Sequence, residues 1–576
     1  MYNKYYQHEL FKLRELAKEF AKAHPAAAPM LSSESVDPDV ERLLEGTAFL
    51  TGHLHHKIDD DFPEVIHGLM DIVYPHYLRP VPSISIVSFT PKPSLIETIK
   101  VPAGTFLSSK EKNGIKCTFQ TCFDLDVHPF KIKNAKTSVQ DKKYQISLSC
   151  ELSGISLPQW NSDTISFSLA GSYSKTSDIF ACFTKFLSKI KIINKDGSKS
   201  HVFAENDLKP LGFDKNNSLF SYPAQSFSGF SLLQEYFIFP QKFLFFELSG
   251  FNNWKNRPNN NQFDIVFEFS EPSFDLPEVN TDNFSLFSIP AINYFPFEAE
   301  PVVIDHTKEK VRVRPSSKTG TGYQIYSVDK VTGYSQGSVK PIEYKPMDYY
   351  SFDTHNKSFY KATRQVSPVT NKYEVYLNLT YTKEKTEYNQ ETLTIDLTCT
   401  NGSEPEQLMP GDICEHTSNS PELLNFKNIT APTTNVEPPL EGDTLWRLLS
   451  HMSLNLLSLK GAQSLREMLQ LYIFQDSRDK GMVTANLKRI NGISDFIIEK
   501  EDRLIKGMVV RGEKITIFLS KEGFASLGDV VVFGSVIDEF FSRYSSINSY
   551  TRLIINETIS GESFSWAPRI GNTHLK

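Results

Sequence analysis

The sequence predicts a multidomain α+β protein with an N-terminal helical arm, β-rich middle domains and a C-terminal α+β domain. The chain has 576 residues, which is too long for one hydrophobic core. Apolar residues recur every three or four positions up to residue 62, and they alternate with polar residues from residue 84 onward. Helical and strand patterns then follow one another in the last part of the chain. These three observations give the predicted class.

Residues 2–24 are predicted to form a first amphipathic helix. Its apolar side chains follow at steps of three or four, and charged residues take the other positions. The stripe consists of Tyr6, Leu10, Leu13, Ala17 and Phe20.

A second helix is predicted to begin at Asp37. The Asp37 side chain can accept from the first N–H groups of the helix, and Pro38 suits its first position. Its apolar seam is narrow, which is typical of a helix that packs against partner helices. The seam consists of Val40, Leu44, Thr47, Thr51, Leu54, Ile58 and Phe62. Residues 63–73 can form a further short helix, which must end before Pro75.

The two stripes form the predicted partner interface. Neither helix has a core of its own, so both are expected to depend on packing against other elements. The alternative is a helical cap that folds back on the β-rich body of the same chain.

The middle of the chain is predicted to be mostly strands. Strand patterns occur at 164–171, 323–339, 372–384 and 391–402, and one helix is expected at 178–190. The aromatic-rich stretch 227–251 is predicted to be a buried strand pair. Residues 281–304 are expected to be an irregular crossing between domains, and 401–440 a long surface connection.

The C-terminal part is predicted to combine three helices with two strand regions. The helices are expected at 442–459, 462–474 and 527–547, and the strands at 507–520 and 549–558. The resulting domain division is 1–80, 81–300, 301–436 and 437–576.

Composition excludes several classes of protein. A net charge of −7 with a pI near 6.1 gives no electrostatic drive toward nucleic acid. The N-terminus has no signal-peptide core, and no window approaches the roughly 18 apolar residues that a membrane span needs. The six cysteines include no CxxC pair. We therefore expect a cytoplasmic protein without direct membrane insertion.

Two motifs are weighed as a metal site and as a serine-hydrolase site. His53, His56 and Asp60 share one face of the second predicted helix, but that face lies opposite the apolar seam. A solvated outer face is therefore preferred over a metal site as the interpretation.

Residues 333–337, GYSQG, match the G-x-S-x-G pattern of serine hydrolases around Ser335. A nucleophile elbow needs a helix directly after the serine, and Pro341 with its β-branched neighbours argues against one. The sequence therefore predicts no catalytic, cofactor or metal site.

Two functions of other classes stay open as alternatives. One is a hydrolase that uses Ser335. The other is a surface carbohydrate-binding β protein, which the many aromatic residues favour.

Several stretches together resemble the TssF family, also called VasA or ImpG, of the bacterial type VI secretion system. They follow one another in order from the N-terminus to residue 569, so the resemblance covers the whole chain. The stretches are YYQHEL (5–10), DPDVERLLEG (37–46), DDDFPE (59–64), YPHYLRPVPS (74–83), LLQEYFIFPQKFLFFELSGF (232–251), NYFPFEAEPVVIDH (293–306), YSVDKV (326–331), LTCTN (397–401), LWRLLSHMSLNLLSL (445–459), VVRG (509–512), RYSSINSYTR (543–552) and WAPR (566–569).

The resemblance implies a structural, non-enzymatic baseplate wedge subunit similar to the wedge proteins of contractile phages. It implies that a second TssF copy and one TssG join through a helical core bundle, with further contacts to TssK and TssE. Such wedges are expected to surround a spike hub and prime the sheath, at a baseplate docked on the inner membrane. This sequence departs from the family pattern at Thr47, where an aromatic residue is expected, and in the loops 308–322 and 401–436.

Overall fold

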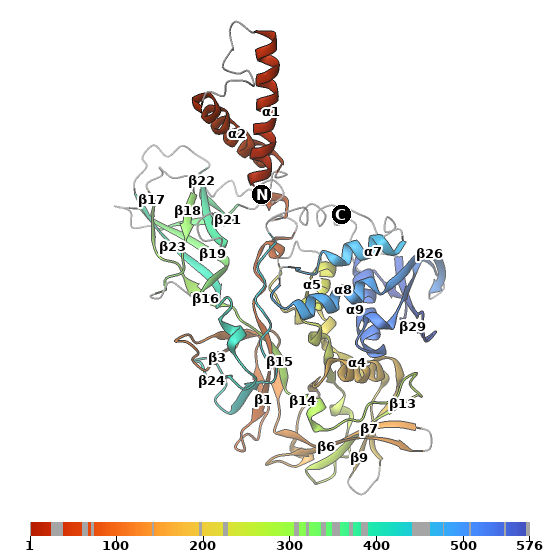
Figure 1. Ribbon diagram of the computed structural model, residues 1–576. Helices are drawn as coiled ribbons and strands as arrows, with labels where there is room; N and C mark the ends of the chain where they lie inside the picture. Colours follow the sequence, from red (N-terminus) through yellow and green to blue (C-terminus); the bar gives the residue numbers. More distant parts are fainter. Residues whose placement is uncertain are drawn as a thin grey trace. The chain divides into compact units, whose positions relative to one another are not determined.

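The computed structural model describes most of the chain and divides it into two units (Figure 1). The first unit holds the N-terminal helices, and the second begins at Tyr74 and holds all the sheets. The described residues are 2–24, 38–59, 67–70, 74–140, 143–194, 199–222, 228–304, 310–317, 322–335, 341–347, 358–367, 373–381, 390–439, 461–475, 477–505, 508–545 and 549–571.

The first unit contains the two predicted long helices, α1 (Tyr2–Ala23) and α2 (Pro38–Asp59). Both predictions are confirmed, and residues 67–70 are also helical. The predicted cap Asp37 and the predicted helix at 442–459 lie outside the described residues.

The second unit starts with a six-stranded antiparallel sheet in the order β24-β3-β4-β15-β1-β25. The strands β2 and β5, which come from the same part of the sequence as β1, β3 and β4, form a separate antiparallel pair. The bounds are β1 (Ile84–Pro91), β2 (Ile99–Val101), β3 (Phe106–Ser109), β4 (Thr118–Thr121), β5 (Leu125–Val127), β15 (Ser288–Ile292), β24 (Ile413–Glu415) and β25 (Leu424–Asn428).

Two further sheets follow, of five strands (β10-β9-β13-β7-β6) and four strands (β11-β12-β8-β14). The alternation predicted for 164–171 is confirmed, because Ile165, Phe167 and Leu169 are buried. The bounds are β6 (Phe130–Gln140), β7 (Lys143–Leu152), β8 (Ile165–Leu169), β9 (Leu187–Asn194), β10 (Lys199–Val202), β11 (Leu208–Pro210), β12 (Phe245–Leu248), β13 (Gln262–Phe269) and β14 (Phe284–Leu286).

An eight-stranded sheet occupies residues 295–400, in the order β16-β23-β19-β20-β21-β22-β18, with β17 also paired to β23. Its strands confirm the predicted strand patterns at 324–335, 373–381 and 391–400. The bounds are β16 (Phe295–Glu298), β17 (Val302–Ile304), β18 (Lys310–Val313), β19 (Gln324–Ser335), β20 (Ile342–Pro346), β21 (Ser358–Val366), β22 (Tyr373–Tyr381) and β23 (Glu391–Thr400).

The C-terminal part is a five-stranded sheet with helices, as predicted. The helix α9 begins at a capping serine, since the Ser526 Oγ accepts from the Asp529 nitrogen at 3.2 Å, and it connects the parallel strands β27 and β28. The helix α8 was not predicted. The bounds are α7 (Gly461–Gln470), α8 (Lys480–Asn491), β26 (Ile493–Ile505), β27 (Met508–Leu519), α9 (Leu527–Tyr544), β28 (Ser549–Glu557), β29 (Ser563–Ser565) and β30 (Arg569–Ile570).

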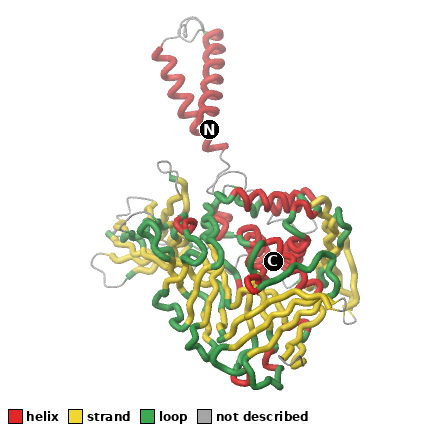
Figure 2. Tube along the Cα trace, turned by 60° about the horizontal axis from the view of Figure 1, so that its bottom comes forward, coloured by secondary structure: helices red, strands yellow, loops and turns green. Residues whose placement is uncertain are grey.

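Two more helices interrupt the middle sheets, and with α7 to α9 they gather beside the strands (Figures 1 and 2). The helix α4 (Tyr173–Ala181) continues through one π-helical turn, Cys182–Phe186. The helix expected at 178–190 is therefore confirmed up to residue 186, and its last residues belong to β9. Gly528 of α9 touches α4 so closely that a Cβ would lie 2.3 Å from the Ser177 carbonyl carbon.

The strand pair predicted at 227–251 is wrong. The stretch forms the helix α5 (Ser228–Ile238), a 3-10 turn (Pro240–Leu244) and the strand β12. The helix is buried on all sides, so its sequence carries no amphipathic period and reads as a continuous apolar run. Burial of the stretch was predicted correctly, because Phe230, Tyr236 and Phe237 are each less than 5% exposed.

The irregular crossing predicted at 281–304 is also wrong, because this segment contributes β14, β15, β16 and β17. The surface connection predicted at 401–440 is wrong as well, because this segment contains β24 and β25, which form the two edges of the first sheet. Both segments contain short strands that pair with strands distant in sequence. Short strands carry too few residues for a clear alternation of apolar and polar side chains. The four-domain division stays a prediction, although the first sheet and the eight-stranded sheet each take strands from both sides of residue 300.

Within the described part of the chain, no helix combines the length and apolarity that crossing a membrane requires.

Candidate interaction surface

The two helices of the first unit pack on each other. Gly52 of α2 lies against the backbone of α1, and a Cβ there would be 3.1 Å from the Tyr6 nitrogen. Arg14 and Glu41 form an ion pair nearer the other end of the contact, so the helices run antiparallel. Ala48 is fully buried between these two points. Small residues on α2 therefore allow a close helix-to-helix approach.

This contact occupies part of the predicted seam. Tyr6, Leu10 and Leu13 on α1 are half-buried, as are Leu44 and Thr51 on α2. Leu44 and Thr51 lie one turn to either side of Ala48, on the side that faces α1. Much of the seam thus has a partner inside the chain, which the sequence prediction did not foresee.

The remaining predicted residues divide into two groups. Thr47 is exposed, and the Phe20 side chain is 50% exposed near the end of α1. The side chains of Val40, Leu54 and Ile58, and the whole of Phe62, lie outside the described residues.

A second row of apolar residues on α2 faces away from α1. Leu43 and Leu50 are 71% and 64% exposed, and Thr47 lies between them at helical spacing. The Thr47 hydroxyl donates to the Leu43 carbonyl at 2.8 Å, so its hydrogen bond is made within the helix. Phe49 of α2 and Phe11 and Leu16 of α1 are also more than half exposed. We call Leu43, Thr47 and Leu50 the outer row.

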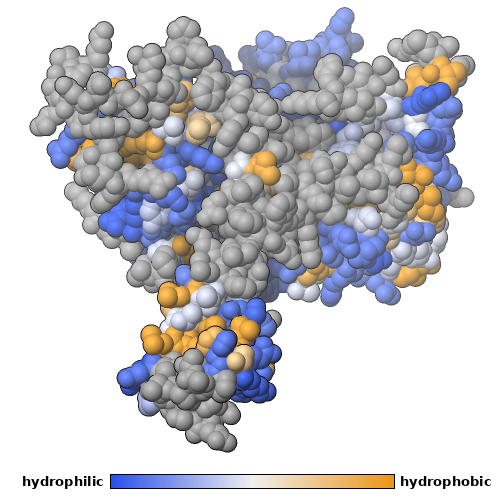
Figure 3. All heavy atoms as spheres, turned by 90° about the horizontal axis from the view of Figure 1, so that it is seen from above, coloured by the Kyte–Doolittle hydropathy of each residue, from blue (hydrophilic) through white to orange (hydrophobic). Residues whose placement is uncertain are grey.

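Figure 3 shows hydrophobic side chains on the surface of the helical unit, at the bottom of that view. Large exposed apolar side chains that gather on one small unit are typical of a protein interface. Of the outer row, the sequence prediction named only Thr47. Two rows at helical spacing, through Leu43 and through Leu44, run side by side, and the prediction followed the row of Leu44, which packs against α1.

The described residues of the two motifs considered above do not form a metal site or a nucleophile elbow. His53 is exposed on α2, and the His56 side chain and Asp60 lie outside the described part. Among the residues that the structure describes, no three His, Cys, Asp or Glu side chains lie together as a metal site would require. Ser335 ends the strand β19, and the next described element is the antiparallel strand β20 rather than the helix of a nucleophile elbow.

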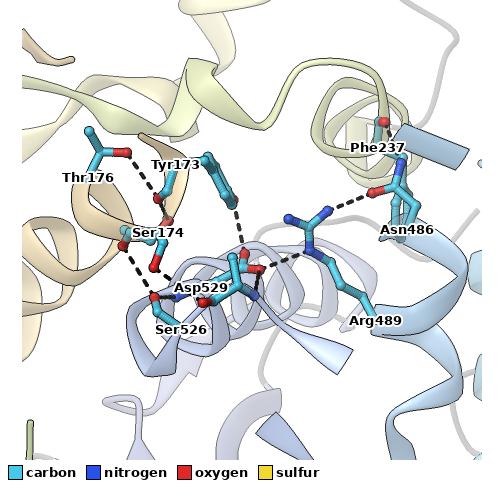
Figure 4. A network of polar contacts seen from close by, with 10 residues as sticks. Tyr173, Ser174, Thr176, Phe237, Asn486, Arg489, Ser526 and Asp529 are labelled. Atoms are coloured by element: carbon cyan, nitrogen blue, oxygen red, sulfur yellow. Dashed lines mark hydrogen bonds and ion pairs between the residues drawn. The ribbon is translucent and has the colours of Figure 1, made fainter. Parts of the chain in front are cut away.

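The second unit contains a buried polar network (Figure 4). Fully buried Asp529 at the start of α9 accepts from the Tyr173 hydroxyl of α4 and from Arg489 Nε of α8, both at 3.0 Å. Asn486 extends the network by donating to the Phe237 carbonyl of α5 at 2.8 Å. Burial, together with the Asp529 carboxylate, raises the pKa of Tyr173 well above its usual value, so this hydroxyl stays a donor. The network ties four helices into one body.

Comparison with known proteins identifies the family. The model of the family "Type VI secretion system, TssF" matches residues 2–573. The chain belongs to the TssF family. The resemblance predicted from the sequence is therefore confirmed.

A curated relative of this TssF-family chain is type VI secretion system component TssF1 of Pseudomonas aeruginosa. It is 26% identical over 619 residues, which cover 99% of this chain and 98% of the relative. A chain from a cryo-electron microscopy structure of the type VI secretion system TssK-TssF-TssG baseplate subcomplex is 29% identical. It has a TM-score of 0.77 and covers 93% of this chain and 99% of its own length.

A chain from a structure of the type VI secretion baseplate complex shares the fold. The TM-score is 0.63 with 24% identity, and the match covers both chains completely. The predicted multidomain α+β class is thereby confirmed for this TssF-family chain.

Proposed function

We propose that this chain is a structural, non-enzymatic baseplate wedge subunit of a type VI secretion system. The observation that carries the proposal is its similarity, over 93% of its length, to a chain of the TssK-TssF-TssG baseplate subcomplex. On this proposal the chain assembles with a second copy of itself, with TssG, TssK and TssE, and around a spike hub that primes the sheath. It acts in the bacterial cytoplasm, at a baseplate docked on the inner membrane.

The outer row supports a role in assembly. The helices α1 and α2 together are called the helical hairpin. Its exposed leucines suit contacts with helices of another subunit, because binding would remove the apolar surface of each leucine from water. The two rival functions lack such support. The many aromatic residues favoured carbohydrate binding, but those at 230–246 are buried, and Ser335 lies in a strand pair.

Co-expression of the full chain with the TssG and TssK subunits of the same organism tests the proposal. A ternary complex of defined mass, measured by size exclusion with light scattering, is expected. The double variant Leu43→Asp/Leu50→Asp should lose the helical partner while its second unit stays folded. As a matched control, Ile96→Asp/Ile559→Asp adds the same charge at exposed apolar positions of the second unit and should leave assembly intact.

A wild-type chain that stays monomeric beside folded TssG and TssK would overturn the proposed function. Normal assembly by the outer-row variant would keep the function but remove the outer row from the interface.

A further inference from the structure

The second unit contains a cavity of about 760 Å³. Its walls come from α4 and its π-helical turn, from β9, from the edge strand β11, from α9 and from the segment that carries Trp566. Its floor is aromatic, with Phe180, Phe183 and Phe246 all less than 5% exposed. The volume is within the range of cavities that bind ligands in proteins.

The charges that line this cavity are mainly positive. Lys185, Lys189 and Lys209 contribute to the lining, and within the described residues none of the three forms an ion pair with a carboxylate. Lys185 is held in place, because its Nζ donates to the Ser565 carbonyl at 2.7 Å and lies 3.7 Å from the centre of the Trp566 ring.

The acidic residue of the lining does not neutralise these lysines. Glu539 is already paired, with Arg543 at 3.0 Å and with Arg569 at 2.5 Å. Burial, together with the nearby Arg569, lowers the pKa of Lys185 to about 8, although the Asp538 carboxylate opposes this shift. A further carboxylate that enters the cavity would face this buried cation.

One of the strands that contribute residues to the cavity is an edge strand. The strand β11 is at the edge of its sheet, where Lys209 pairs with Glu247 of β12 on one side. In the described chain no strand pairs with its other side, so an extended peptide could add there through the N–H and C=O of Leu208, whereas Pro210 has no N–H to donate. This feature distinguishes a peptide from a lipid-like anion, because only a peptide has N–H and C=O groups to pair along the strand.

We propose that this cavity receives an extended acidic segment of a partner protein, with its apolar side chains on the aromatic floor and its carboxylates facing Lys185, Lys189 and Lys209. The inference rests on the proposed assembly function, in which the ligands of the chain are other proteins. It adds a second contact, built on charge and strand pairing, to the apolar contact of the helical hairpin.

Titration of the purified full chain with defined probes tests this proposal. The probe is a hexapeptide of alternating acidic and apolar residues, Asp-Leu-Glu-Phe-Asp-Leu, blocked at both ends. The comparison probes are the same peptide with lysine at each acidic position, and dodecanoate. Calorimetry gives the affinity, and tryptophan fluorescence compared between wild type and Trp566→Phe locates the binding.

We expect the acidic peptide to saturate one site and to bind about ten-fold or more weakly to Lys189→Glu/Lys209→Glu. The control Lys136→Glu/Lys255→Glu makes the same change of net charge elsewhere, Lys136 being in β6 at the far edge of the five-stranded sheet, and should bind like wild type. Equal weakening by both double variants, binding of dodecanoate but not of the acidic peptide, or no binding of either would each overturn the proposal.

Co-purification of the same variants with TssG and TssK separates the two hypotheses. If the wild-type chain assembles but the peptide does not bind, the cavity proposal fails and the baseplate function stands. If the wild-type chain does not assemble, the baseplate function itself fails.

Discussion

Gly52 of α2 lies directly against the backbone of α1 at Tyr6, and a Cβ on the glycine would be only 3.1 Å from the Tyr6 nitrogen. The contact sets the spacing of the helical hairpin. It also leaves the outer row of α2 on the side away from α1.

Replacing Gly52 by leucine should separate the two helices, because the side chain has no room against the α1 backbone. We expect the hairpin to lose about 1–3 kcal/mol of stability, measured by amide hydrogen exchange of α1 and α2 in the full chain. The control is Gly46→Ala on the same helix, where a Cβ meets nothing within 4 Å. That change should stabilise the helix by up to about 1 kcal/mol. Equal protection in both variants would contradict the close packing.

Adjacent leucines of α2 should respond differently to charge. Leu44→Asp places a carboxylate in the half-buried contact with α1, so exchange protection of both helices should fall, at a cost on the order of 2 kcal/mol. Leu43→Asp changes a side chain that is 71% exposed, so protection should hold while affinity for helical partners falls. If Leu43→Asp loosens the hairpin as much as Leu44→Asp, the assignment of the two rows is wrong.

Breaking the Arg489–Asp529 pair should destabilise the second unit strongly. Arg489→Met leaves the fully buried Asp529 carboxylate without its cation, and such losses cost about 3–5 kcal/mol. Chemical denaturation of the full chain measures the change. Lys514→Met breaks a pair with Glu499 that is exposed to solvent, and should cost no more than about 1 kcal/mol. Similar losses in the two variants would show that the network of Figure 4 does not tie the helices together.

Asp538 should give the folded protein a pH dependence. Burial raises the pKa of this carboxyl to about 6, although Arg569 and Lys185 oppose the shift. An unfolded chain releases the proton near pH 4, so the folded state binds more protons between about pH 4 and pH 6. The free energy of unfolding must therefore fall as pH rises through this window, by at most about 3 kcal/mol.

The variant Asp538→Asn lacks this titration. The stability of wild type relative to the variant should decline from about pH 4 to pH 6 and then level off. The exposed Asp275→Asn serves as a control and should show a much smaller change across the window. A difference between wild type and Asp538→Asn that does not vary with pH would exclude the raised pKa.

Local patterns predicted those elements whose two faces differ in environment. The helices α1, α2 and α9 were found, as was the long strand β27, because each repeats apolar residues at its own period. The helix α5 was not predicted, because it is buried on all sides and its sequence has no polar face to set against an apolar one. The strands β24 and β25 were not predicted for another reason. They are short, and their partners β3 and β1 lie near the start of the chain.

The partner interface on the hairpin stays a prediction, although the two helices that carry it were located from the sequence. The sequence could not show which of two adjacent rows α1 covers, because Leu43 and Leu44 have the same residue type and nearly the same spacing to their neighbours. Gly52 was the available signal, since a glycine inside a helix indicates close approach of another backbone.

The first sheet has a consequence for the synthesis of the chain. The Ser85 hydroxyl of β1 donates to the Thr430 carbonyl, 345 residues later, and β25 completes the same edge. At ribosomal rates of about 5–20 residues per second, that partner emerges roughly 20–70 s after β1. The eight-stranded sheet, whose strands all lie between these two, can form in the meantime. The earliest sheet in sequence is thus among the last to close, and until then β1 presents an open edge to the ribosome exit and its chaperones.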